Sequence, residues 1–131
     1  MSKKVNTNES GDAEKEAILK DAKELAELLN SKKANNIVLL DVAEQTPIAD
    51  FFLIVSAESF IHSRALEDYS KKHLEVAGYK RLNISNIYPE NPWILLDYGE
   101  IIVHIFMQDA RVYYELEKLW YDSKKISLEL K

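Results

Sequence analysis

The chain has 131 residues, of which 47% are hydrophobic and 30% charged, and it contains no cysteine. These values fit one soluble domain with its own core, and they exclude disulfide bonds and Cys-ligated zinc or iron–sulfur sites. Seventeen basic and 22 acidic side chains give a net charge of −5, which argues against a general nucleic-acid binder, whose affinity comes from cations that neutralise phosphates. Because residues 1–11 lack the apolar core of a signal peptide and no apolar run reaches the roughly 20 residues of a membrane span, we expect a cytoplasmic protein with no membrane partner.

The first element expected along the chain is a helix. Residues 1–11 are mostly polar, with too little apolar surface to offset the entropy lost on ordering, so a disordered tail is predicted. Asp12 is suited to cap a helix that ends near Lys33. The apolar residues of this helix recur at spacings of three and four, which predicts one buried stripe. They are Ile18, Ala22, Leu25, Ala26 and Leu29.

Two strands and a second helix follow. Residues 37–42 and 51–55 are short apolar runs rich in β-branched and aromatic side chains, which predicts inner strands covered on both faces. Ser59 offers an N-cap to the second helix, and Gly78 supplies the left-handed residue that ends it. The expected buried face of this helix consists of Ile61, Ala65, Leu66, Tyr69 and His73. The charged residues expected in solvent are Arg64, Glu67, Asp68, Lys71, Lys72 and Glu75.

The most distinct local pattern is a hairpin. It follows a weaker strand candidate at residues 79–85 and a loop with two prolines at residues 86–92. Two apolar runs then flank Tyr98-Gly99, and a glycine at that point suits a tight turn. With these two residues as the loop, Trp93 lies opposite His104, whereas a bulge at the glycine would shift the register by one. The two predicted strands are residues 93–97 and 100–106.

The end of the chain completes one domain. A helix is predicted over residues 110–121, before a basic, fraying tail at residues 123–131, so the domain spans residues 12–122. The hairpin requires an antiparallel pair, while the second helix can carry a crossover between parallel strands. We therefore predict an α/β fold with a small mixed sheet of about five strands and helices packed on it. The strand order is left open.

The sequence has none of the motifs that would indicate the catalytic and metal sites considered below. The chain has no G-x-S-x-G motif, and its glycines Gly11, Gly78 and Gly99 are too far apart to form a phosphate-binding loop. The candidate metal ligands have neither H-x-x-x-H nor D-x-D spacing. These candidates are Asp41, Asp50, Asp97, His62, His73 and His104. No catalytic residue, cofactor or metal is therefore expected.

Aromatic residues point to a different kind of site. Trp93 follows Pro92 at the start of a predicted strand, where its ring is either part of the core or an exposed anchor for a partner. Four more aromatic residues have the same two readings, namely Tyr113, Tyr114, Trp120 and Tyr121. On an acidic chain, such aromatic residues suit a protein interface better than an RNA groove.

Four blocks of the chain together have a specific pattern. They are residues 37–42, 48–54, 93–104 and 114–120. The third block, followed at a fixed distance by the fourth, is the most specific, because apolar strands alone occur in many folds. On these blocks the chain, from about Ala17 to Trp120, resembles the ribosomal silencing factor S family, also called the Iojap family.

The resemblance implies a non-enzymatic translational repressor. Members of this family bind the fourteenth protein of the large ribosomal subunit and block joining of the small subunit when nutrients are short. A nucleotidyltransferase-like fold without the catalytic residues is implied, as are at most limited contact with ribosomal RNA and a homodimer. Carried over by position, the partner-binding residues are Trp93, Asp97, Tyr98, His104, Arg111 and Tyr114. The alternative is a nucleotidyltransferase-like enzyme or an RNA-processing factor, which the lack of paired carboxylates on one strand disfavours.

Overall fold

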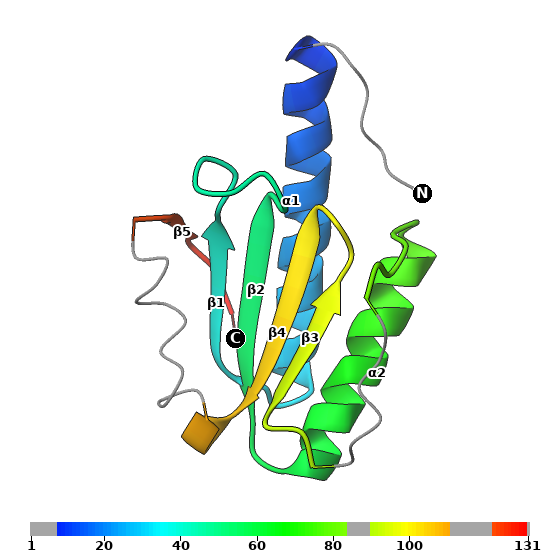
Figure 1. Ribbon diagram of the computed structural model, residues 1–131, viewed down its shortest axis with the longest axis vertical. Helices are drawn as coiled ribbons and strands as arrows, with labels where there is room; N and C mark the ends of the chain where they lie inside the picture. Colours follow the sequence, from blue (N-terminus) through cyan, green and yellow to red (C-terminus); the bar gives the residue numbers. More distant parts are fainter. Residues whose placement is uncertain (1–7, 84–89, 111–121, 131) are drawn as a thin grey trace.

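The computed structural model in Figure 1 describes residues 8–83, 90–110 and 122–130. Within these residues the chain forms two long helices and one five-stranded sheet. The helices are α1 (Asn8–Ser31) and α2 (Phe60–Val76). The strands are β1 (Asn35–Asp41), β2 (Phe51–Ala57), β3 (Trp93–Asp97), β4 (Ile101–Met107) and β5 (Lys124–Ile126). No helix in the described part of the chain is both long and apolar enough to cross a membrane.

The sheet is mixed, as predicted. Its strand order is β3-β4-β2-β1-β5. The central pair β2 and β4 is parallel, whereas β1 with β2, β1 with β5 and β3 with β4 are antiparallel. The chain runs from β2 through α2 and β3 before it returns as β4, so the second helix lies in the crossover that a parallel pair requires.

Two clusters of buried side chains lie on opposite faces of the sheet. Strand β2 is buried along its whole length and contributes to both, because successive residues point to opposite faces. Phe51, Leu53 and Val55 belong to the cluster that also contains the buried residues of α1 and α2, which we call the helix-side core. Phe52 and Ile54 belong to the second cluster, which we call the far-side cluster. Both helices therefore pack on one face of the sheet, as the ribbon also shows (Figure 1).

Helix α1 has the predicted buried stripe but an earlier start. It begins at Asn8, before the Asp12 cap that the sequence predicted, so part of the expected disordered tail is helical. All five stripe residues from Ile18 to Leu29 are essentially inaccessible to solvent and belong to the helix-side core. Residues 1–7 of the predicted tail lie outside the described residues.

Helix α2 has the predicted ends but a different buried face. The Ser59 hydroxyl accepts a hydrogen bond from the backbone N–H of His62 at 3.0 Å, and Gly78 follows the helix with φ = +102°. The predicted buried stripe is partly wrong, because Leu66 is fully buried but Ile61 is 85% exposed and Tyr69 is 38% exposed. The residues that are buried are Ser63, Leu66, Glu67, Ser70 and Leu74.

Polar residues can occupy this face because each finds a partner. The hydroxyls of Ser63 and Ser70 donate to backbone carbonyls of the preceding turn, at 2.9 and 2.8 Å. Glu67, predicted in solvent, is instead buried and pairs with Arg64 at 3.0 Å and Arg81 at 3.5 Å. Small hydroxyl side chains and a paired carboxylate therefore pack beside Leu66 and Leu74 on the buried face of α2.

The described part of the predicted strand at 79–85 is not a strand, yet it covers the free edge of β3. The Asn83 amide donates to the Leu95 carbonyl at 2.8 Å and accepts from the Asp97 N–H at 2.9 Å. The backbone N–H of Leu82 donates to the Asp97 carbonyl at 2.7 Å. An asparagine side chain thus takes the place of a neighbouring peptide group in the ladder, which protects an edge strand from pairing with other chains.

The hairpin is confirmed, but its register differs by two residues from the predicted one. Trp93 lies opposite Phe106 and Leu95 opposite His104. The backbone N–H of Tyr98 donates to the Ile101 carbonyl at 3.0 Å, so the two-residue loop is Gly99-Glu100 rather than Tyr98-Gly99. Gly99 has φ = +81°, which the first position of such a turn requires. A slip of two residues keeps every side chain on its predicted face.

The predicted fraying tail is partly wrong, because residues Lys124–Ile126 form β5 at the edge of the sheet. They pair with Leu39, Leu40 and Asp41 of β1, and Ile126 packs against the helix-side core. Packing of this partly buried side chain and three residues of ladder pairing hold the short segment on the sheet. Most of the predicted helix at 110–121 lies outside the described residues, and residues 108–110 are helical.

Candidate functional site

An aromatic cluster on the far side of the hairpin brings two of the predicted site residues together. The Trp93 indole Nε1–H donates to His104 Nδ1 at 3.1 Å. The Trp93 ring also stacks on Phe106 with a centroid separation of 5.1 Å, and Phe52 lies 4.8 Å from the His104 ring. Because the register places Trp93 diagonally from His104 across the hairpin, the two rings meet without being directly paired. We call these four residues the hairpin aromatic cluster.

His104 is a neutral imidazole in this cluster. Its Nδ1 accepts the hydrogen bond from Trp93, so its proton is on Nε2. The side chain is 4% exposed, and burial lowers the pKa of His104 to about 4. Nε2 has no hydrogen-bond partner among the residues that the structure describes. His104 therefore shapes the site from within and holds the indole of Trp93 in one orientation.

The outer boundary of the site is a row of side chains on β3. Trp93, Leu95 and Asp97 point to the far side and are partly exposed, whereas Ile94 and Leu96 between them are buried in the helix-side core. This alternation follows from the period of two in a strand. We call Trp93, Leu95 and Asp97 the β3 row. Sequence reasoning did not select Leu95, although the same alternation could have found it.

Asp97 organises the turn that joins β3 to β4. Its Oδ1 accepts from the backbone N–H of Gly99 at 2.9 Å, and its own backbone N–H donates to Asn83. A carboxylate that accepts from the N–H two residues on is a standard way to close a turn. Asp97 thus fixes the end of the β3 row with its side chain and its backbone.

Tyr98 lies on the opposite face from Trp93, Asp97 and His104. Its ring is 2% exposed within the helix-side core, and its hydroxyl donates to Glu75 of α2 at 3.1 Å. Burial, together with the bond to this carboxylate, raises the pKa of Tyr98. The structure therefore places Tyr98 where it anchors the hairpin to α2 and away from the β3 row.

A buried ionic group also ties the hairpin to α2, and sequence reasoning missed it. Arg81 lies 3.5 Å from Glu67 of α2 and also donates to the Leu95 carbonyl of β3 at 3.2 Å. Arg64 forms the other ion pair of Glu67. Arg64 lies only three residues before Glu67, but Arg81 lies beyond the end of α2, so no local pattern signalled that Glu67 is buried between them. We call Glu67, Arg64 and Arg81 the Glu67 triad.

The other predicted site residues and the candidate metal ligands contribute no further site among the described residues. Arg111 and Tyr114 lie outside the described residues. Within residues 8–83, 90–110 and 122–130, no group of three or more His, Asp or Glu side chains is arranged to hold a metal ion. Asp41 forms an ion pair with Lys15 at 3.0 Å and accepts from the Ala43 N–H at 3.1 Å.

Comparisons with known proteins agree on one family. The family model described as "Ribosomal silencing factor during starvation" matches residues 15–131. A ribosomal silencing factor RsfS of Halalkalibacterium halodurans is 37% identical over 101 residues, which cover 77% of this chain and 86% of that protein. The RsfS of Bacillus subtilis is 33% identical over 100 residues, covering 76% and 84% of the two chains.

Solved structures share the fold. A crystal structure of a Bacillus halodurans protein superposes with a TM-score of 0.68 at 31% identity and covers 86% of this chain and 99% of that one. A crystal structure of a Chromobacterium violaceum protein has a TM-score of 0.70 at 26% identity and covers 88% and 92%. Because the family model matches nearly the whole chain and relatives above 30% identity cover more than two thirds of it, this chain belongs to the ribosomal silencing factor family, whose role is regulation at the ribosome.

Proposed function

We propose that this protein binds the large ribosomal subunit through its fourteenth protein and blocks joining of the small subunit, especially in starvation. Family membership supports a role at the ribosome. A mouse relative, 30% identical over 99 residues that cover 73% of this chain and 43% of that protein, is named for the assembly of the mitochondrial ribosomal large subunit. The large subunit is therefore the proposed partner.

The observation that carries this proposal is the β3 row. Trp93, Leu95 and Asp97 present an aromatic ring, an aliphatic group and a carboxylate side by side on one strand. Aromatic side chains on a rigid support are typical anchors of protein interfaces, because little side-chain entropy remains to be lost on binding. The hydrogen bond to His104 and the stacking on Phe106 supply that support for Trp93.

The other predicted residues take different parts in this proposal. His104 and Tyr98 are buried, so we assign them to shaping and anchoring the hairpin. Arg111 and Tyr114 remain proposed contacts, on the strength of the family resemblance alone. A homodimer and at most limited contact with ribosomal RNA are also proposed. The net charge of −5 disfavours an interface dominated by RNA phosphates.

We further propose that the protein acts without catalysis, by steric exclusion. Asp41 and Asp97 are engaged in holding a loop and a turn through the Ala43 and Gly99 N–H groups. Two-metal phosphoryl or nucleotidyl transfer needs carboxylates that converge on ions about 4 Å apart. The local roles of these carboxylates support a binding function over a nucleotidyltransferase-like enzyme.

Co-sedimentation with separated ribosomal subunits tests the proposal. We expect the tagged protein to sediment with large subunits and to reduce the formation of whole ribosomes when small subunits are added. Raising the salt from about 50 to 200 mM should weaken binding far less than the roughly thousandfold loss typical of a protein that contacts many phosphates. Sedimentation with neither subunit, or with small subunits only, would contradict the proposal.

A further inference from the structure

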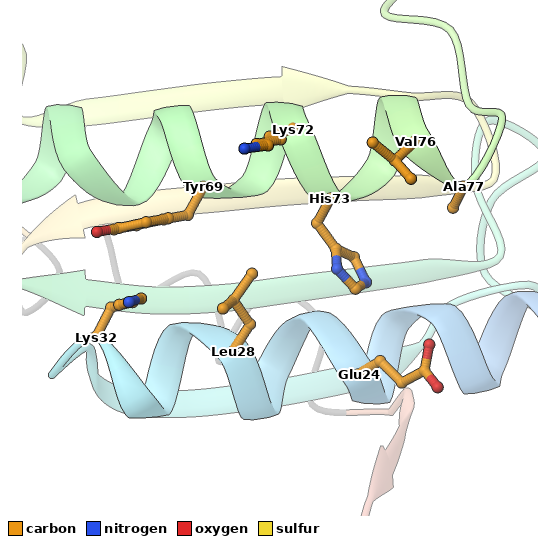
Figure 2. Close-up of a pocket in the computed structure, with 8 residues that line it drawn as sticks. All are labelled: Glu24, Leu28, Lys32, Tyr69, Lys72, His73, Val76 and Ala77. Carbon is orange, nitrogen blue, oxygen red and sulfur yellow. The ribbon is translucent and has the colours of Figure 1, made fainter.

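A groove of about 520 Å³ runs between α1 and α2, on the helical side of the sheet (Figure 2). It is distinct from the β3 row, which faces away from the helices. Its α1 wall consists of Glu24, Leu28 and Lys32. Its α2 wall consists of Tyr69, Lys72, His73, Val76 and Ala77. The volume is in the range of small-molecule sites, about 300 to 1,000 Å³.

The groove contains the apolar residues of α2 that the core does not use. Tyr69 belongs to the stripe that the sequence predicted as buried, and it is 38% exposed here. Val76, two turns further along the helix, is 82% exposed. With Leu28 of α1, which is only partly buried, these side chains form an apolar surface for a ligand between the helices (Figure 2). Large apolar side chains gathered in a concave site are typical of ligand binding.

One ammonium group lies at one end of this apolar surface, and a second lies on α2 nearer its middle. Lys32 lies over the Tyr69 ring, with Nζ 4.7 Å from the ring centroid, and Lys72 reaches from α2 on the other side of the groove (Figure 2). Glu24 is placed toward the opposite end, near His73 and Ala77. An anionic group would therefore be attracted to the Lys32 end and repelled at the Glu24 end, which orients an elongated ligand.

His73 forms part of the α2 wall of the groove. Its ring is directed from α2 toward α1 (Figure 2). Its Nε2 is buried and has no hydrogen-bond partner among the residues that the structure describes. Because this nitrogen has no accessible surface, an occupant of the groove contacts the His73 ring and not Nε2.

We propose that this groove binds a small organic anion with an apolar or aromatic body. The anionic group contacts Lys32 at the Tyr69 end of the groove, with Lys72 of α2 adding positive charge nearer its middle, and the body lies against Leu28, Tyr69 and Val76. This inference goes beyond the ribosomal function, because it concerns the opposite face of the sheet.

Two probes distinguish an anion with an aromatic body from one with an aliphatic body. We would titrate the free protein with 8-anilinonaphthalene-1-sulfonate, which has an aromatic body, and with decanoate, which has an aliphatic one, and follow backbone amide NMR shifts. We expect saturable binding of at least one probe, with shifts confined to the C-terminal halves of α1 and α2. The tighter probe identifies the type of body. Inorganic phosphate, which has no apolar body, should cause no saturable shift.

Variants assign the binding to the groove. The double variant Lys32→Met and Lys72→Met keeps the alkyl stems and removes both charges, so affinity should fall about tenfold or more. Lys71→Met, on the same helix but outside the groove, should bind as the wild type does, and unfolding midpoints report that all variants fold. The proposal is wrong if neither probe saturates up to about 5 mM, if the double variant binds normally, or if Lys71→Met loses as much affinity.

Discussion

The two faces of the sheet are built from different kinds of side chain. The helix-side core is mainly aliphatic and joins α1, α2 and all four long strands. The far-side cluster is smaller and richer in aromatic residues, and a buried neutral histidine, His104, lies among its rings. The difference indicates that one face holds most of the fold together, while the other supports the partly exposed β3 row that we propose as the binding surface. Strand β3 takes part in both, so neighbouring residues on it should have separable effects.

The largest loss of stability is expected when a side chain of the helix-side core is truncated. Leu96 is fully buried in the helix-side core, whereas Leu95, its neighbour in the β3 row, is only partly buried. Leu96→Ala should lower the free energy of unfolding by about 2 to 5 kcal/mol, and Leu95→Ala by less than about 1.5 kcal/mol. Denaturant unfolding of this matched pair measures the difference. Equal losses would contradict the division between the faces.

Disruption of the Glu67 triad should lower the free energy of unfolding by a somewhat smaller amount. Glu67→Gln keeps the shape of the side chain but leaves the nearly buried Arg81 without its carboxylate. Loss of one partner of a buried ion pair should cost about 3 kcal/mol of unfolding free energy. Asp68→Asn, at the exposed neighbouring position, is the control and should change it by less than about 0.5 kcal/mol. If both variants unfold alike, the triad does not hold α2 to the hairpin.

On the far side, His104 should make stability depend on pH. The folded pKa of about 4 lies below the ordinary 6.5, so the unfolded chain takes up a proton at this residue while the folded chain does not. His104 therefore destabilises the fold as the pH falls from 6.5 toward 4, by about 2 kcal/mol at pH 5. Unfolding of the wild type and of His104→Phe between pH 7 and 5 tests this. Parallel pH profiles for the two proteins would exclude a depressed pKa at His104.

Local patterns predicted the elements but not the contacts between distant segments. Continuous apolar runs were sufficient for β1, β2 and the hairpin strands, and Gly99 marked the turn. The register was missed because both Tyr98-Gly99 and Gly99-Glu100 are compatible with a two-residue loop and with the same alternation of faces. Strand β5 was missed because three residues that include two lysines have no strand pattern of their own.

The candidate site was also predicted only in part, because some of its contacts join segments that are distant in the sequence. The sequence was sufficient to predict that Trp93 and His104 lie near each other, since both lie on one face of the hairpin. The buried face of α2 was not, because Ser63, Glu67 and Ser70 look like solvent residues until their partners are known. The contacts of Arg81 and Asn83 with β3 join segments more than ten residues apart, which no periodicity reports.

The affinity of Trp93→Ala for isolated large subunits, measured beside its unfolding midpoint, tests the central claim most directly. If Trp93 is an interface anchor, binding should weaken by about 2 kcal/mol or more, roughly 30-fold. The loss in unfolding free energy should stay below the 3 to 5 kcal/mol expected when a fully buried tryptophan is removed. Normal binding by Trp93→Ala, or unfolding as severe as that of Leu96→Ala, would show that the indole belongs to the core and that the partner contacts the protein elsewhere.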